Sequence, residues 1–225
     1  MGGVGAESRV LRLAAAGVRE VALLGAHCDD LALGAGGTLL RLAEAGAGLR
    51  VRALVLCGGG SVRAAEERAA LESFCPAAEL DLTVLELPDG RTPAHWDAAK
   101  SAVAELRRGG DPDLVFAPQR GDAHQDHRLL AELAPTEFRD HPILGYEILK
   151  WETDTPRPAL FVPLPTAVAE RKAELLLKHY PSQHDRDWFD RDAFLGLSRL
   201  RGVQCRAPHA EAFVVDKAVL AFGGV

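Results

Sequence analysis

The sequence predicts an α/β fold with a mostly parallel sheet. Short apolar segments that suit strands alternate along the 225 residues with helical segments of ten residues or more. Helices of that length can serve as the crossover connections between parallel strands. The strand segments are apolar throughout, which is typical of strands whose two faces are both covered by helices.

The first three elements are predicted as strand, helix and strand. Residues 20–27, EVALLGAH, form an apolar run that ends in small residues. Residues 36–48 are predicted as a helix, because leucines recur there at helical spacing and glycines follow them. The second strand, 51–57, is apolar and is closed by three glycines. A charged helix is predicted next, at 62–74.

The middle of the chain continues the alternation. A third strand is predicted at 82–87, and a Pro-Asp-Gly turn follows it. The next helix covers 92–110, with Thr92 as its N-cap, Pro93 at its first helical position and two glycines at its end. The fourth strand is predicted at 113–118.

The last predicted elements are strands at 143–149 and 159–164 and a helix at 165–180. No repeat, low-complexity tract or linker interrupts the series, so we expect one domain over residues 1–225. The fold predicted for it is Rossmann-like, with three layers and a mostly parallel sheet. In such sheets the ligand site lies beyond the carboxyl ends of the strands, and the active site is expected there.

The composition excludes several classes of partner. The net charge is -6 and the basic residues are dispersed, so we expect no nucleic-acid partner. No apolar run reaches the length of a membrane span. The four cysteines form no C-x-x-C pair, which favours a reduced, cytoplasmic protein. No stripe of apolar residues in the sequence marks a subunit interface. A homo-oligomer is possible, and the sequence does not decide the oligomeric state.

Two clusters of histidines and aspartates follow predicted strands, about a hundred residues apart. They are His27, Asp29 and Asp30 after the first strand, and His124, Asp126 and His127 after the fourth. Three such ligands with an open position are what a catalytic zinc needs, and iron, cobalt or nickel accept the same donors. The alternative is a purely structural role, in which the aspartates cap helices and the histidines are hydrogen-bonded loop residues.

The residues of both clusters carry a resemblance to a known family. The stretch AHCDDLALGAGGTLL with the later DAHQDH resembles the PIG-L/LmbE-like family of zinc-dependent N-acetylglucosaminyl de-N-acetylases. The resemblance extends to RAAE, LPDG, YPSQ and AEAF farther along the chain. It implies Zn²⁺ as the cofactor, with Fe²⁺, Co²⁺ or Ni²⁺ as substitutes, and His27, Asp30 and His127 as the metal ligands.

The resemblance also implies roles for five other residues. Asp29 would be the general base that acts on the attacking water. His124 would stabilise the oxyanion and protonate the leaving amine, and Asp126 would orient a neighbouring imidazole. Arg63 in RAAE and Asp89 in LPDG match positions that hold sugar hydroxyls in relatives.

Other side chains near these motifs have two interpretations each. Cys28 stands where the family usually has proline; we interpret it as an inert small residue rather than a soft metal ligand, because its side chain must point away from its neighbours'. Trp151 and Trp188 fit either core positions or a sugar-stacking wall, and the usual burial of tryptophan favours the core. His184 and Arg186 follow the YPSQ stretch, where they can reach the mouth of the site.

The predicted function is metal-dependent hydrolysis of an N-acetyl group from an N-acetylglucosamine-type sugar or glycoconjugate, which gives a free amine and acetate. We expect a small acetamido sugar as substrate, in antibiotic, glycan or thiol-cofactor biosynthesis. One alternative is a thiol-conjugate amidase of the same family. Two others are a non-haem iron oxygenase, whose usual jelly-roll scaffold does not match the alternating pattern, and a non-catalytic sugar-binding module.

Overall fold

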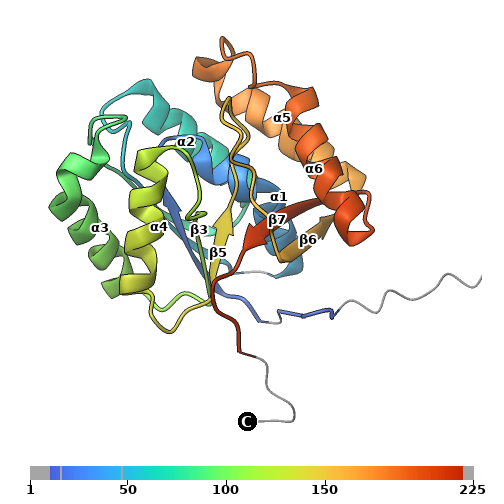
Figure 1. Cartoon of the computed structure of the whole chain (residues 1–225), viewed down its shortest axis with the longest axis horizontal. Coiled ribbons are helices and arrows are strands. Elements are labelled where there is room, and N and C mark those ends of the chain that lie inside the picture. Colours follow the sequence, from blue (N-terminus) through green and yellow to red (C-terminus); the bar gives the residue numbers. More distant parts are fainter. Residues whose placement is uncertain (1–10, 16, 47, 220–225) are drawn as a thin grey trace, which may run out of the picture.

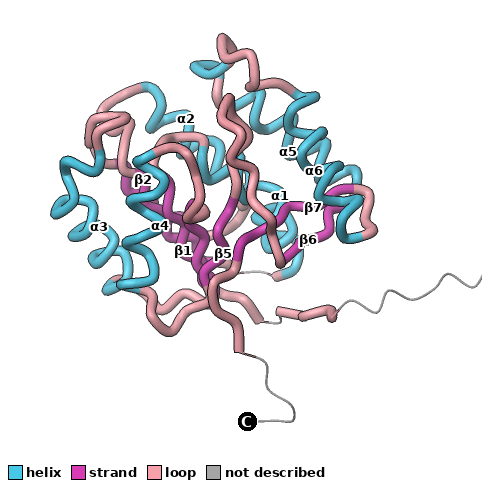
Figure 2. Tube along the Cα trace, viewed as in Figure 1, coloured by secondary structure: helices cyan, strands magenta, loops and turns pink. Residues whose placement is uncertain are grey.

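A sheet between two helical layers organises the molecule (Figures 1 and 2). This computed structural model describes residues 11–15, 17–46 and 48–219, and the elements below lie within them. The seven strands are β1 (Glu20–Gly25), β2 (Arg50–Val55), β3 (Glu79–Val84), β4 (Leu114–Pro118), β5 (Ile143–Tyr146), β6 (Leu160–Leu164) and β7 (His209–Val214). The α-helices are α1 (Asp30–Ala45), α2 (Val62–Phe74), α3 (Trp96–Arg108), α4 (Gln125–Glu137), α5 (Thr166–His179) and α6 (Arg191–Cys205).

The sheet order is β3-β2-β1-β4-β5-β7-β6. The first five strands in this order are parallel, while β7 runs antiparallel to both β5 and β6. The predicted three-layer fold with a mostly parallel sheet is therefore confirmed. Because β1 lies between β2 and β4, the chain segments that leave β1 and β4 start side by side at one edge of the sheet.

Alternate side chains of one strand serve the two layers. Val21 and Leu23 belong to the apolar cluster that contains residues of α1, α2 and α5. Ala22 and Leu24 belong to the cluster on the other face, with residues of α3 and α4. This arrangement buries both faces of β1 and explains why its sequence is a continuous apolar run.

Helix α1 begins six residues earlier than the sequence pattern predicted, at Asp30 instead of residue 36. The glycines that obscured its start are packing positions inside the helix. A Cβ atom on Gly34 would lie 2.3 Å from the Tyr146 ring, and one on Gly36 would lie 2.7 Å from the Phe74 ring. These glycines let the helix approach its neighbours closely, so the GAGG stretch serves packing in this fold.

The predicted helix 92–110 differs in its first turn. Thr92 and Pro93 belong to a short 3-10 helix (Thr92–His95), and α3 itself begins at Trp96 with His95 as its N-cap. The side chain of Thr92 therefore does not cap α3. Instead its backbone amide donates a hydrogen bond to Asp126, which ties this turn to the start of α4.

Three elements were missed by the sequence reading, namely α4, α6 and β7. Helix α4 begins within the second histidine cluster, so its polar first turn hid its periodicity. Strand β7 pairs in the antiparallel part of the sheet and contains the AEAF stretch. In the part of the chain that the structure describes, no helix has both the length and the apolar character of a membrane span.

Candidate active site

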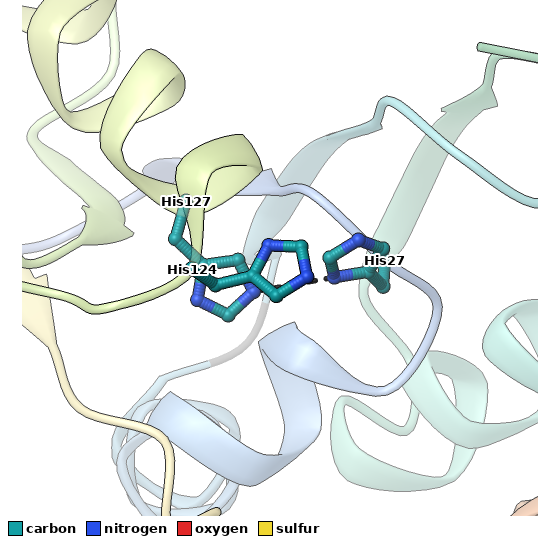
Figure 3. A group of neighbouring side chains, drawn as sticks. All are labelled: His27, His124 and His127. Carbon is teal, nitrogen blue, oxygen red and sulfur yellow. Dashed lines mark hydrogen bonds between the residues drawn. The ribbon is translucent and has the colours of Figure 1, made fainter. Parts of the chain in front are cut away.

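The two predicted clusters meet at the carboxyl ends of β1 and β4. His27 lies in the loop after β1, and the same loop leads through Asp29 to Asp30, the first residue of α1. His124 is the N-cap of α4, and His127 lies in the first turn of that helix. Figure 3 shows the imidazoles of His27, His124 and His127 turned toward one another from these two segments.

Three donor atoms form a compact triangle at this point. His27 Nδ1 lies 3.2 Å from His127 Nε2, and Asp30 Oδ2 lies 3.3 Å from the same nitrogen. The third side, from His27 Nδ1 to Asp30 Oδ2, is 3.7 Å long. All three side chains are buried. Ligands of a tetrahedral zinc ion, at bond lengths of about 2.1 Å, stand about 3.4 Å apart, so the triangle fits such an ion.

Hydrogen bonds hold the side chains of His127 and Asp30 in place at their corners of the triangle. Asp122 Oδ2 accepts from His127 Nδ1 at 2.9 Å, which leaves His127 Nε2 free to face the triangle. Asp30 Oδ2 accepts from the backbone amides of Ala26 and His27, each at 2.9 Å. Sequence reasoning missed Asp122, although it lies inside the quoted DAHQDH stretch.

The far nitrogen of His27 faces a second acidic group. His27 Nε2 lies 3.0 Å from Asp89 Oδ1 and 3.2 Å from Asp126 Oδ2. Asp126 is fully buried and also accepts from the backbone amides of Gly90 and Thr92. It thus fixes the orientation of the His27 ring. The ligand-type atoms of His27, Asp89, His124 and Asp126 all lie within 4.8 Å of one another, as do those of His27, His124 and His127.

The excess of carboxylates controls the protonation of the histidines. Burial alone lowers the pKa of His27, but the hydrogen bonds that it donates to Asp126 and Asp89, together with the charge of Asp30, outweigh burial and raise the pKa to about 10. Burial is likewise outweighed at His127, whose pKa is raised to about 9 by its aspartate partners. The site therefore attracts positive charge, and a bound cation would supply it in place of the two protons.

Asp29 has an unusual backbone and a buried carboxylate. Its φ is 113° and its ψ is -27°, in the left-handed region that few non-glycine residues adopt. Its carboxylate pairs with Arg63, at 3.0 Å from Oδ2 to Nη2. Burial raises the pKa of Asp29 to about 7, against the opposing charge of Arg63. A carboxylate with such a pKa can take up a proton at neutral pH.

Glu67 holds Asp29 in this conformation. Glu67 Oε2 accepts from the backbone amide of Asp29 at 2.7 Å and from the hydroxyl of Tyr180 at 2.8 Å. Burial raises the pKa of Glu67 to about 8, against the effect of the Tyr180 hydrogen bond. Glu67 follows the RAAE stretch directly and Tyr180 begins the YPSQ stretch. Both stretches were noted in the sequence, but no role was assigned to these two residues.

His124 differs from the other two histidines. It is half-buried, and its Nδ1 accepts a hydrogen bond from the backbone amide of Asp126. Burial lowers the pKa of His124, and the positive charges of His27 and His127 lower it further. A lowered pKa makes the imidazolium of His124 a stronger acid, although less of it is protonated at neutral pH.

Cys28 faces away from these groups. Its side chain is buried in the apolar cluster beside α1 and α2, and its Sγ lies 3.5 Å from the carbonyl oxygen of Cys57. Burial raises the pKa of the Cys28 thiol. A protonated, buried thiol of this kind agrees with the interpretation of Cys28 as an inert small residue.

A cavity of about 270 Å³ opens over the clusters. Arg63 and Asp89, the residues expected to hold sugar hydroxyls, both line it. In this structure Arg63 pairs with Asp29 and Asp89 contacts His27, so each also belongs to the polar network of the site. Trp151 also lines the cavity and is 60% exposed, so the core interpretation is wrong for this residue.

The fold and this geometry define an α/β protein with a candidate metal centre at the carboxyl edge of a mostly parallel sheet. The family model described as PIG-L, GlcNAc-PI de-N-acetylase, matches residues 22–136, and the chain belongs to this family. That range includes every residue of the two clusters. No curated protein is similar to the chain at a significant level.

Several solved structures share the fold. The N,N'-diacetylchitobiose deacetylase from Pyrococcus horikoshii is 19% identical, with a TM-score of 0.68 over 88% of this chain and 84% of that one. The A40926 pseudoaglycone deacetylase Dbv21 is 18% identical, with a TM-score of 0.66 over 91% of this chain and 99% of that one. The 4-carboxy-2-hydroxymuconate hydratase GalB from Pseudomonas putida KT2440 is also 18% identical, with a TM-score of 0.70 over 92% of this chain and 100% of that one. Since the last is a hydratase, the function must be argued from the site.

Proposed function

We propose that this protein hydrolyses the N-acetyl group of an N-acetylglucosamine-type sugar or glycoconjugate at a divalent metal centre, with Zn²⁺ as the metal. Membership of a family described as a de-N-acetylase supports the reaction. The chitobiose and pseudoaglycone deacetylases with this fold support an acetylated substrate. The products would be a free amine on the sugar and acetate.

The triangle of His27, Asp30 and His127 is the observation that supports the proposal most strongly. Two imidazole nitrogens and one carboxylate oxygen leave a tetrahedral ion one open position, as catalytic zinc sites require. A divalent cation bound there would polarise an amide carbonyl and acidify water. Asp122 and Asp126 would keep the two imidazoles in the ligating orientation, since each accepts a hydrogen bond from the far ring nitrogen.

Asp29 is the base in this proposal. Its carboxylate lines the cavity beside the triangle, and its pKa is near neutrality. It takes a proton from the attacking water as the water oxygen bonds to the acetyl carbon. Arg63, 3.0 Å away, opposes the effect of burial and holds the carboxylate in place, because a guanidinium favours the charged form.

His124 is the proposed acid. It lines the same cavity, and its ring centroid lies 4.7 Å from that of His27. In its protonated form it stabilises the negative oxygen of the tetrahedral intermediate. It then gives the leaving nitrogen a proton as the carbon–nitrogen bond breaks. The carboxyl product keeps the water oxygen.

Free-amine release from a substrate panel tests the proposal. The panel contains N-acetylglucosamine, N,N'-diacetylchitobiose, and inositol and nucleotide conjugates of N-acetylglucosamine, each with added Zn²⁺ and with chelator. Chelator-sensitive release that disappears in Asp29→Asn is the expected result. Stoichiometric zinc with no amine from any acetamido sugar would contradict the substrate class, and release that survives chelation would contradict the metal dependence.

A further inference from the structure

Two tryptophans and an arginine form a wall of the cavity that the proposed chemistry does not use. Trp151, Trp188 and Arg186 all line it together with the histidine clusters. We call these three residues the aromatic rim. Trp151 follows β5, whereas the other two lie between α5 and α6, so the rim is assembled from two distant segments. Figure 1 shows the loop after β5 rising beside the chain that follows α5.

The rim is held together by specific contacts. The indole Nε1 of Trp151 donates to Asp187 Oδ1 at 2.7 Å. The guanidinium carbon of Arg186 lies 5.6 Å from the centroid of the Trp151 ring, within the range of a cation–π contact. The rings of Trp151 and Trp188 meet edge to face, with centroids 6.2 Å apart. The exposed Trp151 side chain is therefore fixed in orientation.

The base of the rim is joined to the candidate metal centre. Lys150, the residue before Trp151, places its Nζ 3.0 Å from Asp122 Oδ1 and 2.6 Å from Asp154 Oδ2. The other oxygen of Asp122 accepts from His127. One buried carboxylate thus contacts both a proposed metal ligand and Lys150, the residue before Trp151 in the loop after β5. This gives the rim a fixed place relative to the reacting groups.

The cavity brings the exposed Trp151 together with the polar side chains of the candidate site. Ligand sites typically combine aromatic side chains with a small number of polar groups that fix the orientation of the ligand. The cavity, at about 270 Å³, is just below the range of about 300–1,000 Å³ for sites that enclose drug-sized ligands. It therefore suits one sugar unit, and the remainder of a larger substrate would extend over its edge.

We infer that the aromatic rim is a second subsite, which binds the group attached to the acetamido sugar, and that this group is a ring with a flat apolar face. This inference rests on the proposed function for the identity of the first sugar. Trp151 supplies the stacking surface, while Trp188 and Arg186 hold it. A second pyranose and an arene both present such a face, and a flexible alkyl chain does not.

Binding measurements with an enzyme that cannot turn over separate this inference from the proposed reaction. Isothermal titration calorimetry on zinc-loaded Asp29→Asn compares the affinities for N-acetylglucosamine, N,N'-diacetylchitobiose, phenyl N-acetylglucosaminide and hexyl N-acetylglucosaminide. The two-ring compounds should bind about three- to tenfold more tightly than the monosaccharide and the hexyl glycoside. Tighter binding of N,N'-diacetylchitobiose would indicate that the attached group is a sugar, and tighter binding of the phenyl glycoside would indicate an arene.

The same titrations in Trp151→Leu, made in the Asp29→Asn background, test the rim itself. The advantage of the two-ring compounds should disappear there. Trp96→Leu is the matched control, because Trp96 is 48% exposed but lies outside the cavity lining, and the advantage should persist in it. Thermal unfolding verifies that both variants are folded. Equal affinities for all four glycosides, or an advantage that survives in Trp151→Leu, would overturn the inference.

The inference and the proposed function can fail separately. Ring-dependent binding without amine release in the active enzyme would retain the subsite and contradict the deacetylase proposal. Amine release without any ring preference in binding would support the deacetylase proposal and contradict the subsite.

Discussion

The carboxylate of Glu67 accepts a hydrogen bond from the backbone amide of Asp29, with 2.7 Å between Oε2 and the nitrogen. Asp29 has a φ of 113°, which costs free energy for a residue other than glycine. The contact therefore links α2 to the conformation of the proposed base. Residues at such strained positions keep their place only when neighbouring groups fix them.

Replacing Glu67 by alanine should impair catalysis more than replacing it by glutamine. Glutamine retains an oxygen for the Asp29 amide and the Tyr180 hydroxyl, so kcat should stay within about threefold. Alanine leaves two buried donors without partners. It should lower the free energy of unfolding by about 2 kcal/mol and kcat by about tenfold or more. Denaturant unfolding and steady-state kinetics measure both effects, with Glu66→Gln as the neighbouring control. Equal kcat values for Glu67→Ala and Glu67→Gln would contradict the positioning role.

The raised pKa of Glu67 predicts a slope in the pH dependence of stability. The pKa is about 8 in the folded protein and 4.5 for the ordinary group, so the folded state keeps a proton that the unfolded chain has lost. The free energy of unfolding should therefore fall as pH rises from about 4.5 to about 8. Urea titrations of metal-free protein across this range should show a shallower slope for Glu67→Gln, which cannot titrate there. Identical slopes would mean that Glu67 is ionised in the folded state.

Metal content should separate the roles of two neighbouring residues. Asp29→Asn should bind zinc at full stoichiometry and lose at least about a hundredfold in kcat, because it removes only the base. His27→Ala should lose metal and activity together, because it removes one corner of the triangle. Elemental analysis after dialysis gives the stoichiometry. A fully metallated His27→Ala protein would refute the ligand assignment.

Asp122→Asn tests the support of His127. The substitution removes the negative charge that accepts from His127 Nδ1, and zinc affinity should fall about 10- to 100-fold. Competition with a chromophoric chelator measures the change. Asp140→Asn, at an exposed position, is the control and should bind zinc like the unsubstituted protein.

Gly34→Ala tests the packing of α1. The added methyl group would clash with the Tyr146 ring at 2.3 Å, and the free energy of unfolding should fall by about 1–3 kcal/mol. Gly46→Ala is the control, because among the described residues no heavy atom beyond its chain neighbours lies within 4 Å of its Cβ position, and its φ of -162° suits any residue. Thermal or denaturant unfolding compares the two. Equal stabilities would show that Tyr146 can move aside.

The sequence sufficed for the fold class because apolar strand segments and crossover helices are local patterns. It also located both histidine clusters, since the carboxyl ends of parallel strands must share an edge. It did not predict the start of α1, where glycines selected for contact with Tyr146 and Phe74 resemble a loop. Glu67 and Asp122 act on residues that other segments bring to them, and no local pattern records such a contact.

The shared use of Asp122 has a thermodynamic consequence. One of its oxygens accepts a hydrogen bond from His127 and the other pairs with Lys150. The histidine cluster and the loop with Trp151 therefore contact the same carboxylate. Any ligand that shifts this carboxylate toward one partner changes the energy of the other. Binding of a cation at the proposed metal centre and binding of a ligand at the aromatic rim would then be linked equilibria, in which each alters the affinity of the other by the same factor.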